Sequence, residues 1–389
     1  MRRPARSAAA AVAVAAAALI AGCGGSAPAA PGPAAEAPPG GAPFLATSLV
    51  TPSGTWAVAV MGGSVASHNN FWQLFVRPAG SSSWKLVTPP GTADNGGLVL
   101  GGAGQSLITG FRPSQYLTYT PLTATSDGGQ VWASTGPLDG TLANDPDALA
   151  AAPRTGHLLA LLADGTAEVA APGYTDWKAL ATQRAVAATP AGRTCGLQAL
   201  TAVAYTPTGV PLLAGTCSRP GATGIFADSG GTWQATGPAI PSALARQHIT
   251  VLRLTQTESQ IVVLLAAGSG HAASLLAAWS ADNGRHWALS PALALGGAAL
   301  ASASFGTGGT AAVLTSGGRA EVIAGAGGRW DALPALPAGT ATLAPGTGGQ
   351  TDVLAVHRGT LTTWQLSPGG AAWTKTQTIN VPIQYGSSG

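Results

Sequence analysis

Seven tryptophans recur at similar intervals along the chain, and this repeat limits the possible folds more than any other feature. They stand 48, 45, 56, 54, 43 and 43 residues apart, and each opens a short run such as WKLV or WTKT. The seven are Trp84, Trp132, Trp177, Trp233, Trp287, Trp330 and Trp373. A period of roughly 40 to 55 residues predicts one structural unit repeated seven times.

Strand-like segments separated by glycine-rich turns precede most of these tryptophans. Before Trp330, for example, come ALASASFGTGG, TAAVLTSGG and RAEVIAGAGG. With the run that the tryptophan opens, each unit has four short strands. A sheet of this kind has two apolar faces, which stacking around an axis would bury. The sequence therefore predicts an all-β fold, a single seven-bladed β-propeller with four antiparallel strands per blade over residues 44–389. Counted from Phe44-Leu45-Ala46, its strands end near Asn380; six or eight blades would follow from a miscounted terminal unit.

Three of the repeats carry a sharper motif, S/T-x-D-x-G-x-x-W, twice in full and once in part. The full copies consist of Thr125, Asp127, Gly129 and Trp132, and of Ser280, Asp282, Gly284 and Trp287. The partial copy keeps Asp228, Gly230 and Trp233. The motif resembles the Asp-box, or BNR repeat, of sialidase-like propellers. The resemblance implies that these side chains hold the turn between the third and fourth strands, away from the usual ligand face.

The first 43 residues have the pattern of an export and anchoring segment. Three arginines precede an apolar run from Ala8 to Ile20, and Leu19-Ile20-Ala21-Gly22-Cys23 resembles a bacterial lipobox. The resemblance implies a signal peptide (1–22), acylation of Cys23, and a Pro/Ala/Gly-rich tether (23–43) that cannot bury a core. We therefore expect a lipid anchor in the cell membrane, on its extracytoplasmic side. An ordinary secretory signal that contains a cysteine is the alternative.

The balance of charges argues against nucleic acid as a partner. The chain has 18 Lys and Arg against 15 Asp and Glu, but three of the arginines, Arg2, Arg3 and Arg6, lie in the predicted signal peptide. The remainder therefore carries 15 basic and 15 acidic groups. A neutral protein lacks the basic footprint that polyanion binding requires.

Cys195 and Cys217 flank two strand-like runs that a short turn joins. A hairpin would bring them nearly opposite each other, and outside the cytoplasm a disulfide is the expected outcome. Closing this loop would stabilise the fold by about 3 kcal/mol. Two buried free thiols, or a pair of metal ligands, are the alternatives.

Ligand-binding residues are expected in the loops between second and third strands and between blades, at one mouth of the axial channel. Polar side chains gather in these loops in the first five units. The candidates are His68, Asn70, Arg112, Tyr116, Tyr119, Asp145, Asp147, Arg219, Arg246, His248 and His271.

No catalytic residue, metal site or cofactor is predicted. Asp145 and Asp147 lack the regular spacing of a calcium loop, and the six histidines form no H-x-x-x-H pair for zinc. We expect a binding or scaffold module for a protein, peptide or glycan, because the chain resembles seven-bladed Asp-box propellers that bind polypeptides, of the photosystem-assembly-factor and sortilin type.

Two other functions remain open: a sialidase-like glycosidase with a divergent site, and a purely structural cell-envelope lipoprotein. The segments Arg77-Pro78 and Arg112-Pro113 do not match the R-x-P signature of sialidases, whose catalytic members are six-bladed. Glu168 and Glu321 occupy equivalent strand positions, which predicts outward-facing repeat residues in place of a catalytic acid.

Overall fold

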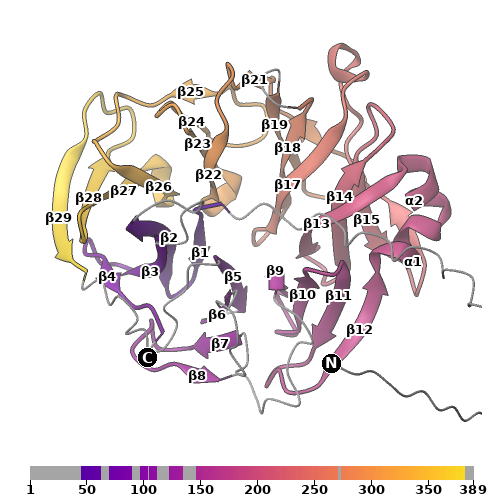
Figure 1. Ribbon diagram of the computed structural model, residues 1–389, viewed down its shortest axis with the longest axis horizontal. Helices are drawn as coiled ribbons and strands as arrows, with labels where there is room; N and C mark the ends of the chain where they lie inside the picture. Colours follow the sequence, from indigo (N-terminus) through magenta and orange to yellow (C-terminus); the bar gives the residue numbers. More distant parts are fainter. Residues whose placement is uncertain are drawn as a thin grey trace, which may run out of the picture. The chain divides into compact units, whose positions relative to one another are not determined.

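The computed structural model describes residues 45–62, 70–89, 97–103, 105–111, 122–134, 146–269 and 273–381, all within the unit Pro38–Gly389. These residues form seven consecutive antiparallel blades of four strands each, as predicted (Figure 1). In every blade the strands pair in chain order, from the innermost to the outermost.

The first three blades consist of β1 (Ser48–Thr51), β2 (Gly54–Gly62), β3 (Asn70–Pro78) and β4 (Lys85–Leu86); β5 (Leu98–Ala103), β6 (Ser106–Phe111), β7 (Leu122–Thr125) and β8 (Ala133–Ser134); and β9 (Pro146–Ala151), β10 (Leu158–Leu162), β11 (Thr166–Ala170) and β12 (Trp177–Thr182). Blades 4 and 5 consist of β13 (Leu197–Tyr205), β14 (Pro211–Cys217), β15 (Gly224–Asp228) and β16 (Trp233–Ala235); and β17 (Ile249–Gln256), β18 (Ile261–Ala267), β19 (Ser274–Ser280) and β20 (Ala288–Leu289).

The last two blades consist of β22 (Leu300–Phe305), β23 (Ala311–Thr315), β24 (Ala320–Ile323) and β25 (Asp331–Ala332); and β26 (Thr340–Pro345), β27 (Thr351–His357), β28 (Thr360–Leu366) and β29 (Thr374–Asn380). A short additional strand, β21 (Leu293–Ala294), pairs with β19. Thr216 of β14 pairs with Thr250 of β17, which joins blades 4 and 5 into one sheet.

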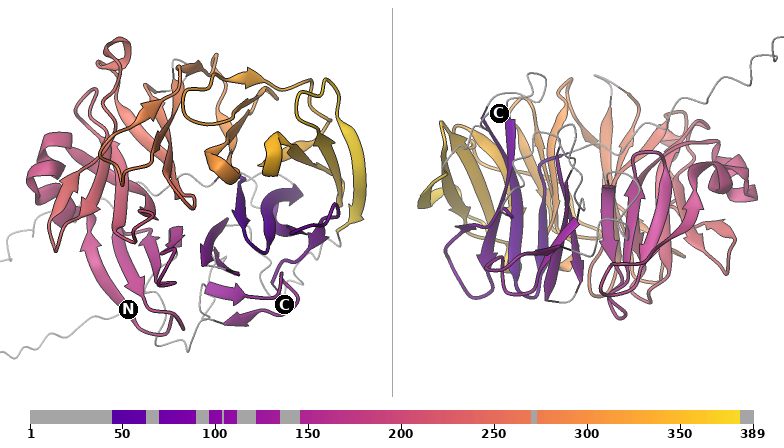
Figure 2. Two further views of the ribbon diagram at one scale, coloured as in Figure 1. Left: turned by 180° about the vertical axis from the view of Figure 1, so that it is seen from behind. Right: turned by 60° about the horizontal axis from the view of Figure 1, so that its bottom comes forward.

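Each of the seven interfaces between neighbouring blades has its own apolar core, and this is what closes the ring. Alternate residues of one strand face opposite interfaces: Trp56 and Val58 pack toward blade 2, whereas Ala57 and Ala59 pack toward blade 7. Period-two alternation in which both faces are apolar is the pattern of a strand buried on both sides. The sheets therefore follow one another around a common axis, as the two views in Figure 2 show.

The seven repeat tryptophans stand at, or one residue before, the start of the outermost strand of each blade. Three of them donate their indole N–H to a backbone carbonyl just after the outermost strand of the preceding blade. The pairs are Trp287 with Thr236 (2.6 Å), Trp330 with Pro291 (3.0 Å) and Trp373 with Pro334 (3.3 Å). The repeat thus marks a contact between blades as well as a position within a blade.

The interface between the last and the first blade replaces that carbonyl with a carboxylate. Trp84 donates its indole N–H to Oδ2 of Asp352 (3.1 Å), which also pairs with Arg77 (3.0 Å). Gln377 exchanges two hydrogen bonds with the backbone of Trp84, of 2.8 and 3.0 Å. We call Arg77, Trp84, Asp352 and Gln377 the closure cluster. Burial raises the pKa of Asp352, against the opposing effect of the Arg77 guanidinium.

Residues 45–47, where the sequence predicts the start of the first strand, lie inside the ring. Ala46 pairs with Ser302 of β22, and Thr47 donates its hydroxyl to the carbonyl of Ala303 (2.8 Å). Because β22 belongs to blade 6 and β1 to blade 1, these residues must pass in front of blade 7. The prediction that strands begin at 44–46 is therefore wrong: β1 begins at Ser48, and Ala46 instead forms a bridge to β22 of blade 6.

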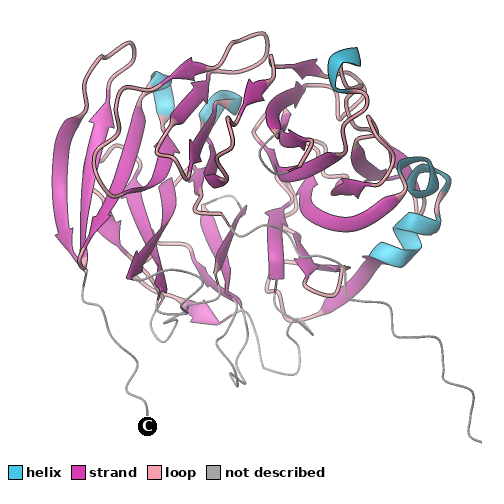
Figure 3. Cartoon of the chain, turned by 45° about the horizontal axis from the view of Figure 1, so that its top comes forward, coloured by secondary structure: helices cyan, strands magenta, loops and turns pink. Residues whose placement is uncertain are grey.

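Helices are few among the described residues, and Figure 3 shows them at the edge of the ring or in short turns. They are α1 (Gln183–Ala188), α2 (Pro190–Cys195) and the 3₁₀ turns η3 (Ser242–Leu244), η5 (Thr307–Gly309) and η6 (Thr347–Gly349). None of the helices in the described part of the chain is long and apolar enough to cross a membrane.

Candidate binding faces of the propeller

The strand order gives the ring two chemically different faces. Turns between the second and third strands of a blade lie at the same end as the connections between blades, because neighbouring strands are antiparallel. We call this end the connection face. Turns between first and second strands, and between third and fourth strands, lie at the other end, which we call the opposite face.

The motif turns lie on the opposite face, and their polar groups bond within the turns. Oδ1 of Asp127 accepts from the backbone N–H groups of Gln130 (2.9 Å) and Val131 (3.0 Å) and from the hydroxyl of Thr125 (2.8 Å). These donors, with Val131 first, hold the pKa of Asp127 below its ordinary value. The carboxylate thereby organises the turn between β7 and β8.

The turn between β19 and β20 repeats this arrangement. Ser280 bonds Asp282 (2.9 Å), whose carboxylate accepts from the backbone N–H of His286 (2.9 Å) and contacts its Nδ1 (2.5 Å). The bonds from His286 lower the pKa of Asp282. Gly284 has φ +89°, and a Cβ there would meet Oγ1 of Thr236 at 2.2 Å, so only glycine fits against the preceding blade. In the partial copy, Asp228 accepts from the backbone N–H of Gly231 (2.9 Å).

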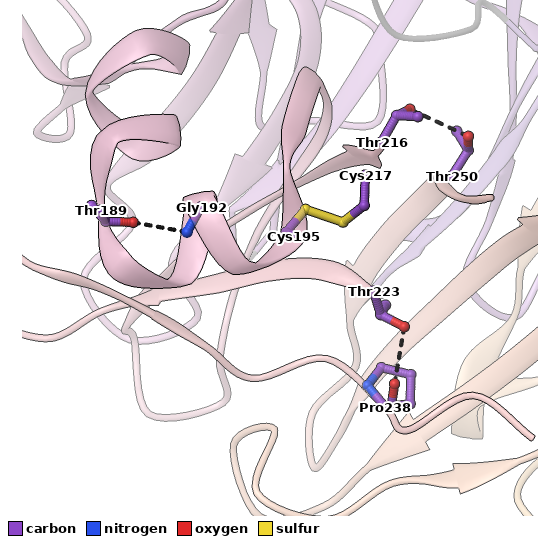
Figure 4. Close-up of a disulfide and its surroundings, with 8 residues drawn as sticks. All are labelled: Thr189, Gly192, Cys195, Thr216, Cys217, Thr223, Pro238 and Thr250. Atoms are coloured by element: carbon purple, nitrogen blue, oxygen red, sulfur yellow. Dashed lines mark hydrogen bonds between the residues drawn. A yellow bond between two sulfur atoms is a disulfide. The ribbon is translucent and has the colours of Figure 1, made fainter. Parts of the chain in front are cut away.

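The connection face of blade 4 carries the predicted disulfide and a helical insertion. Cys195 at the end of α2 bonds to Cys217 at the end of β14, with Cα atoms 5.1 Å apart (Figure 4). Thr189 caps α2 by accepting from the backbone N–H of Gly192 (3.0 Å). The insertion accounts for the 56-residue gap between Trp177 and Trp233, against 43 in the last two blades.

Four exposed arginines lie on this part of the connection face. They are Arg184 in α1, Arg193 in α2, Arg219 in the β14–β15 turn and Arg246 in the β16–β17 connection, and we call them the arginine platform. His248, also exposed, follows Arg246. The sequence has no acidic residue between Asp176 and Asp228, nor between Asp228 and Glu258, and Asp228 lies on the opposite face. The platform is therefore a patch of positive charge without acidic neighbours along its own segments.

Backbone hydrogen bonds fix the platform segments against one another. The N–H of Arg219 donates to the carbonyl of Cys195 (3.2 Å), and the N–H of Gly221 donates to that of Gln247 (2.8 Å). The helical insertion, the β14–β15 turn and the β16–β17 connection therefore form one surface. Since the disulfide ties α2 to β14, this surface keeps its shape without a ligand.

A fifth arginine lies in the axial channel. Arg253, midway along the innermost strand of blade 5, is only partly exposed and donates from Nη2 to Oγ1 of Thr47 (3.0 Å). None of the ion pairs of the described residues includes Arg253, and burial lowers its pKa to about 10. It remains a cation at neutral pH, and among the described residues the bond to Thr47 is the one hydrogen bond of its guanidinium.

Several predicted ligand-face residues lie outside the described residues: His68, Arg112, Tyr116, Tyr119, Asp145 and His271, as do Cys23, residues 1–44 and the tail from 382. Asn70 begins β3, and Arg219 and His248 lie exposed on the connection face. Asp147 differs from its prediction, because it is buried in β9 and does not lie in a loop.

Glu321 also departs from its prediction. It lies on a third strand, as does Glu168, but it is buried and bonded to Arg319 (2.7 Å), so it does not face outward. Burial raises the pKa of Glu168, with a further contribution from Asp164. Sequence reasoning missed Arg184, Arg193 and Arg253; the lack of acidic residues around Arg184 and Arg193 was the available signal.

Two grooves lie away from the platform. One, of about 450 Å³, runs between the outer strand of blade 1 and the turn of Asp127, and Lys85 lines it. The other, of about 220 Å³, lies on the edge of blade 3, lined by His157, Asp176 and Lys178. No three His, Cys, Asp or Glu side chains of the described residues gather as metal ligands would.

Comparisons with known proteins agree on the fold and do not give a family. No protein-family model matches the chain, and no curated protein matches it. A solved structure from Lactobacillus plantarum gives a TM-score of 0.50 at 12% identity, over 84% of this chain and 96% of that one.

Two further solved structures are similar. An ancestral GH74 enzyme gives a TM-score of 0.50 at 11% identity, over 87% of this chain and 46% of its own. The structure of YCF48 bound to D1 peptide gives 0.45 at 16% identity, over 81% and 90%. At these identities the likeness shows the fold alone. Fold and comparisons together define the class of protein, a β-propeller, and the described residues give it seven blades.

Proposed function

We propose that this chain is a binding module, held by acylated Cys23 to the outer side of a membrane, and that it takes an anionic segment of a polypeptide in its axial channel. The observation that carries the proposal is the state of Arg253. Its guanidinium makes one hydrogen bond to a neutral hydroxyl, and none of the ion pairs of the described residues neutralises it.

A desolvated cation without a counter-ion destabilises the fold that holds it. Such a group is retained where a ligand supplies the missing charge, and a carboxylate matches the planar donor pattern of arginine. The segment 45–48 lies inside the ring beside Arg253, so a ligand must reach the guanidinium past this segment. An extended chain can do this more easily than a folded domain. A side-chain or C-terminal carboxylate of a polypeptide is therefore the proposed anion.

Peptide and glycan arrays probed with the chain from residue 24 onward test this proposal. We expect binding to peptides with exposed carboxylates, and an affinity loss of about tenfold or more in Arg253→Gln, because a charge-assisted hydrogen bond contributes about 1.5–3 kcal/mol. Arg154→Gln, an exposed arginine on the opposite face, is the matched control and should bind normally.

The stability of the same variant separates a binding role from a structural one. Removal of an uncompensated buried charge should leave the unfolding temperature of Arg253→Gln unchanged or raise it, whereas a structural arginine would lower it. Equal peptide binding by the variant and the parent chain would contradict the proposal. Binding confined to glycans would favour a glycan module.

A further inference from the structure

The arginine platform is separate from the channel arginine and calls for a partner of its own. Its four cations come from two helices, a turn and a blade connection, and all four side chains are exposed. Charge without a deep site suits an extended anionic surface better than a small anion. A membrane is one such anionic surface, and the place at which the chain enters the ring determines which face of the propeller lies near it.

The chain enters at the connection face, where the platform also lies. Ser48 begins β1, the innermost strand of blade 1, and innermost strands begin at the end of the ring that carries the blade connections. From Cys23 to Leu45 there are 22 residues, which at about 3 Å per residue span at most roughly 66 Å. An anchor at Cys23 would thus keep the connection face within reach of the bilayer.

We propose that the arginine platform docks the propeller onto the anionic headgroups of the membrane. Juxtamembrane arginines each gain attraction to anionic lipid, and several acting together bind where one does not. The helices of the platform lie at the outer edge of the ring, so that docking brings this edge toward the lipid (Figure 1). The anchor and the platform then act as two linked contacts, the second strengthened by the high local concentration that the first provides.

Docking would also set the orientation of the propeller on the membrane. The helical insertion and the β14–β15 turn are fixed to each other by the disulfide and by the bond from Arg219 N–H to Cys195, so the orientation of the platform sets the orientation of the whole propeller. The proposal rests on the proposed function only for the anchor; platform and lipid can be tested without it.

Co-sedimentation with lipid vesicles tests the docking. The chain from residue 24, without the acylated cysteine, is mixed with vesicles of phosphatidylcholine alone or of phosphatidylcholine with phosphatidylglycerol. The strands and helices of the described propeller all lie within residues 45–381, so this shortening removes none of them. We expect binding to the anionic vesicles only, weakening as salt shortens the Debye length, which is about 10 Å at 0.1 M.

The platform variant combines Arg184→Gln, Arg219→Gln and Arg246→Gln, and leaves Arg193, whose guanidinium bonds the carbonyl of Ala188 in the adjacent helix. Each arginine should contribute about fivefold to the vesicle partition coefficient, so we expect a loss of about 100-fold. The control combines Arg154→Gln, Arg285→Gln and Arg329→Gln, three exposed arginines on the opposite face, and should bind like the parent chain. Matching thermal unfolding of both variants would show that each is folded.

Poly-L-glutamate in place of vesicles separates lipid from an acidic polypeptide. Platform-dependent binding to poly-L-glutamate, with none to anionic vesicles, would overturn membrane docking. So would binding that the platform variant retains, or that the control loses. The array experiment on Arg253 leaves the platform intact, so the two proposals can fail independently.

Discussion

The contact between blades 7 and 1 differs from the contact between blades 6 and 7, although the same repeat builds both. In the second, Trp373 donates to a neutral backbone carbonyl, and a short chain connection already holds the blades together. In the first, no connection exists, because the blades stand at the two ends of the propeller. There Trp84 donates to a buried carboxylate, which Arg77 also contacts.

The difference suggests how a repeat protein closes. Between blades 6 and 7, which the chain itself links, apolar packing and neutral hydrogen bonds are sufficient. Between blades 7 and 1, which only non-covalent contacts hold together, the interface has in addition an ion pair and the two hydrogen bonds of Gln377 with Trp84. A buried ion pair contributes little net stability over an apolar pair but makes the wrong partner costly. We therefore infer that the closure cluster mainly specifies which blade faces blade 1.

The largest effect should come from breaking that cluster. Asp352→Ala leaves Arg77 and the indole of Trp84 without their acceptor, and removal of one partner of a buried pair costs about 3–5 kcal/mol. We expect a loss of this size in the free energy of unfolding, measured by denaturant titration. Asp331→Ala, which breaks the exposed pair with Arg329, should cost less than about 1 kcal/mol.

A double-mutant cycle adds a sharper criterion to this result. If Arg77 and Asp352 act together, Arg77→Met combined with Asp352→Ala should cost clearly less than the two single changes added. Additive losses would show that the two residues stabilise the ring independently, and the comparison of the two interfaces would lose its basis.

A smaller effect should separate the two kinds of tryptophan acceptor. Trp84→Phe removes a bond to a carboxylate and should cost about 2–3 kcal/mol, whereas Trp330→Phe removes a bond to a carbonyl and should cost about 1 kcal/mol. Trp84 is buried whereas Trp330 is partly exposed, so the part of the difference that Asp352→Asn abolishes is the part that reports on the acceptor. Equal losses would mean that the acceptor at the closure is not special.

The smallest effect is a difference in pH dependence between carboxylates of the motif turns and of the closure. The lowered pKa of Asp127 and Asp282 means that their stabilisation is complete above the ordinary carboxyl pKa and is lost as the pH falls through the folded-state value. The raised pKa of Asp352 has the opposite sign, because its ionisation weakens the folded state as the pH rises.

Unfolding at a series of pH values on both sides of the ordinary carboxyl pKa, which is about 3.9, measures this contrast. Asp282→Asn should flatten the loss of stability on acidification, and Asp352→Asn should make it steeper. The same sign of change in both variants would contradict the opposite pKa shifts of Asp282 and Asp352. Asp331→Asn, with the same change of charge on an exposed side chain, serves as the control.

The sequence by itself determined the structure of the single blade, which is the repeating unit of this protein. Alternating apolar residues, glycine turns and the seven tryptophans all act within about 50 residues, so they specify four strands per blade without knowledge of the whole. The disulfide belongs here as well, because Cys195 and Cys217 flank a single hairpin whose register, Leu197 opposite Cys217, is local. The helical insertion left only a trace, the long gap between Trp177 and Trp233.

Tertiary structure decided what the blades do together. Arg253 meets Thr47 across 206 positions of sequence, and Trp84 meets Asp352 across 268, because the ring closes after seven sheets. The number of sheets that completes a circle depends on the angle at which packed faces meet, which is a property of side chains on neighbouring blades and has no local pattern. The sequence likewise shows the arginines of the platform only as residues of separate segments. The antiparallel order of the strands brings these segments to one face of the ring.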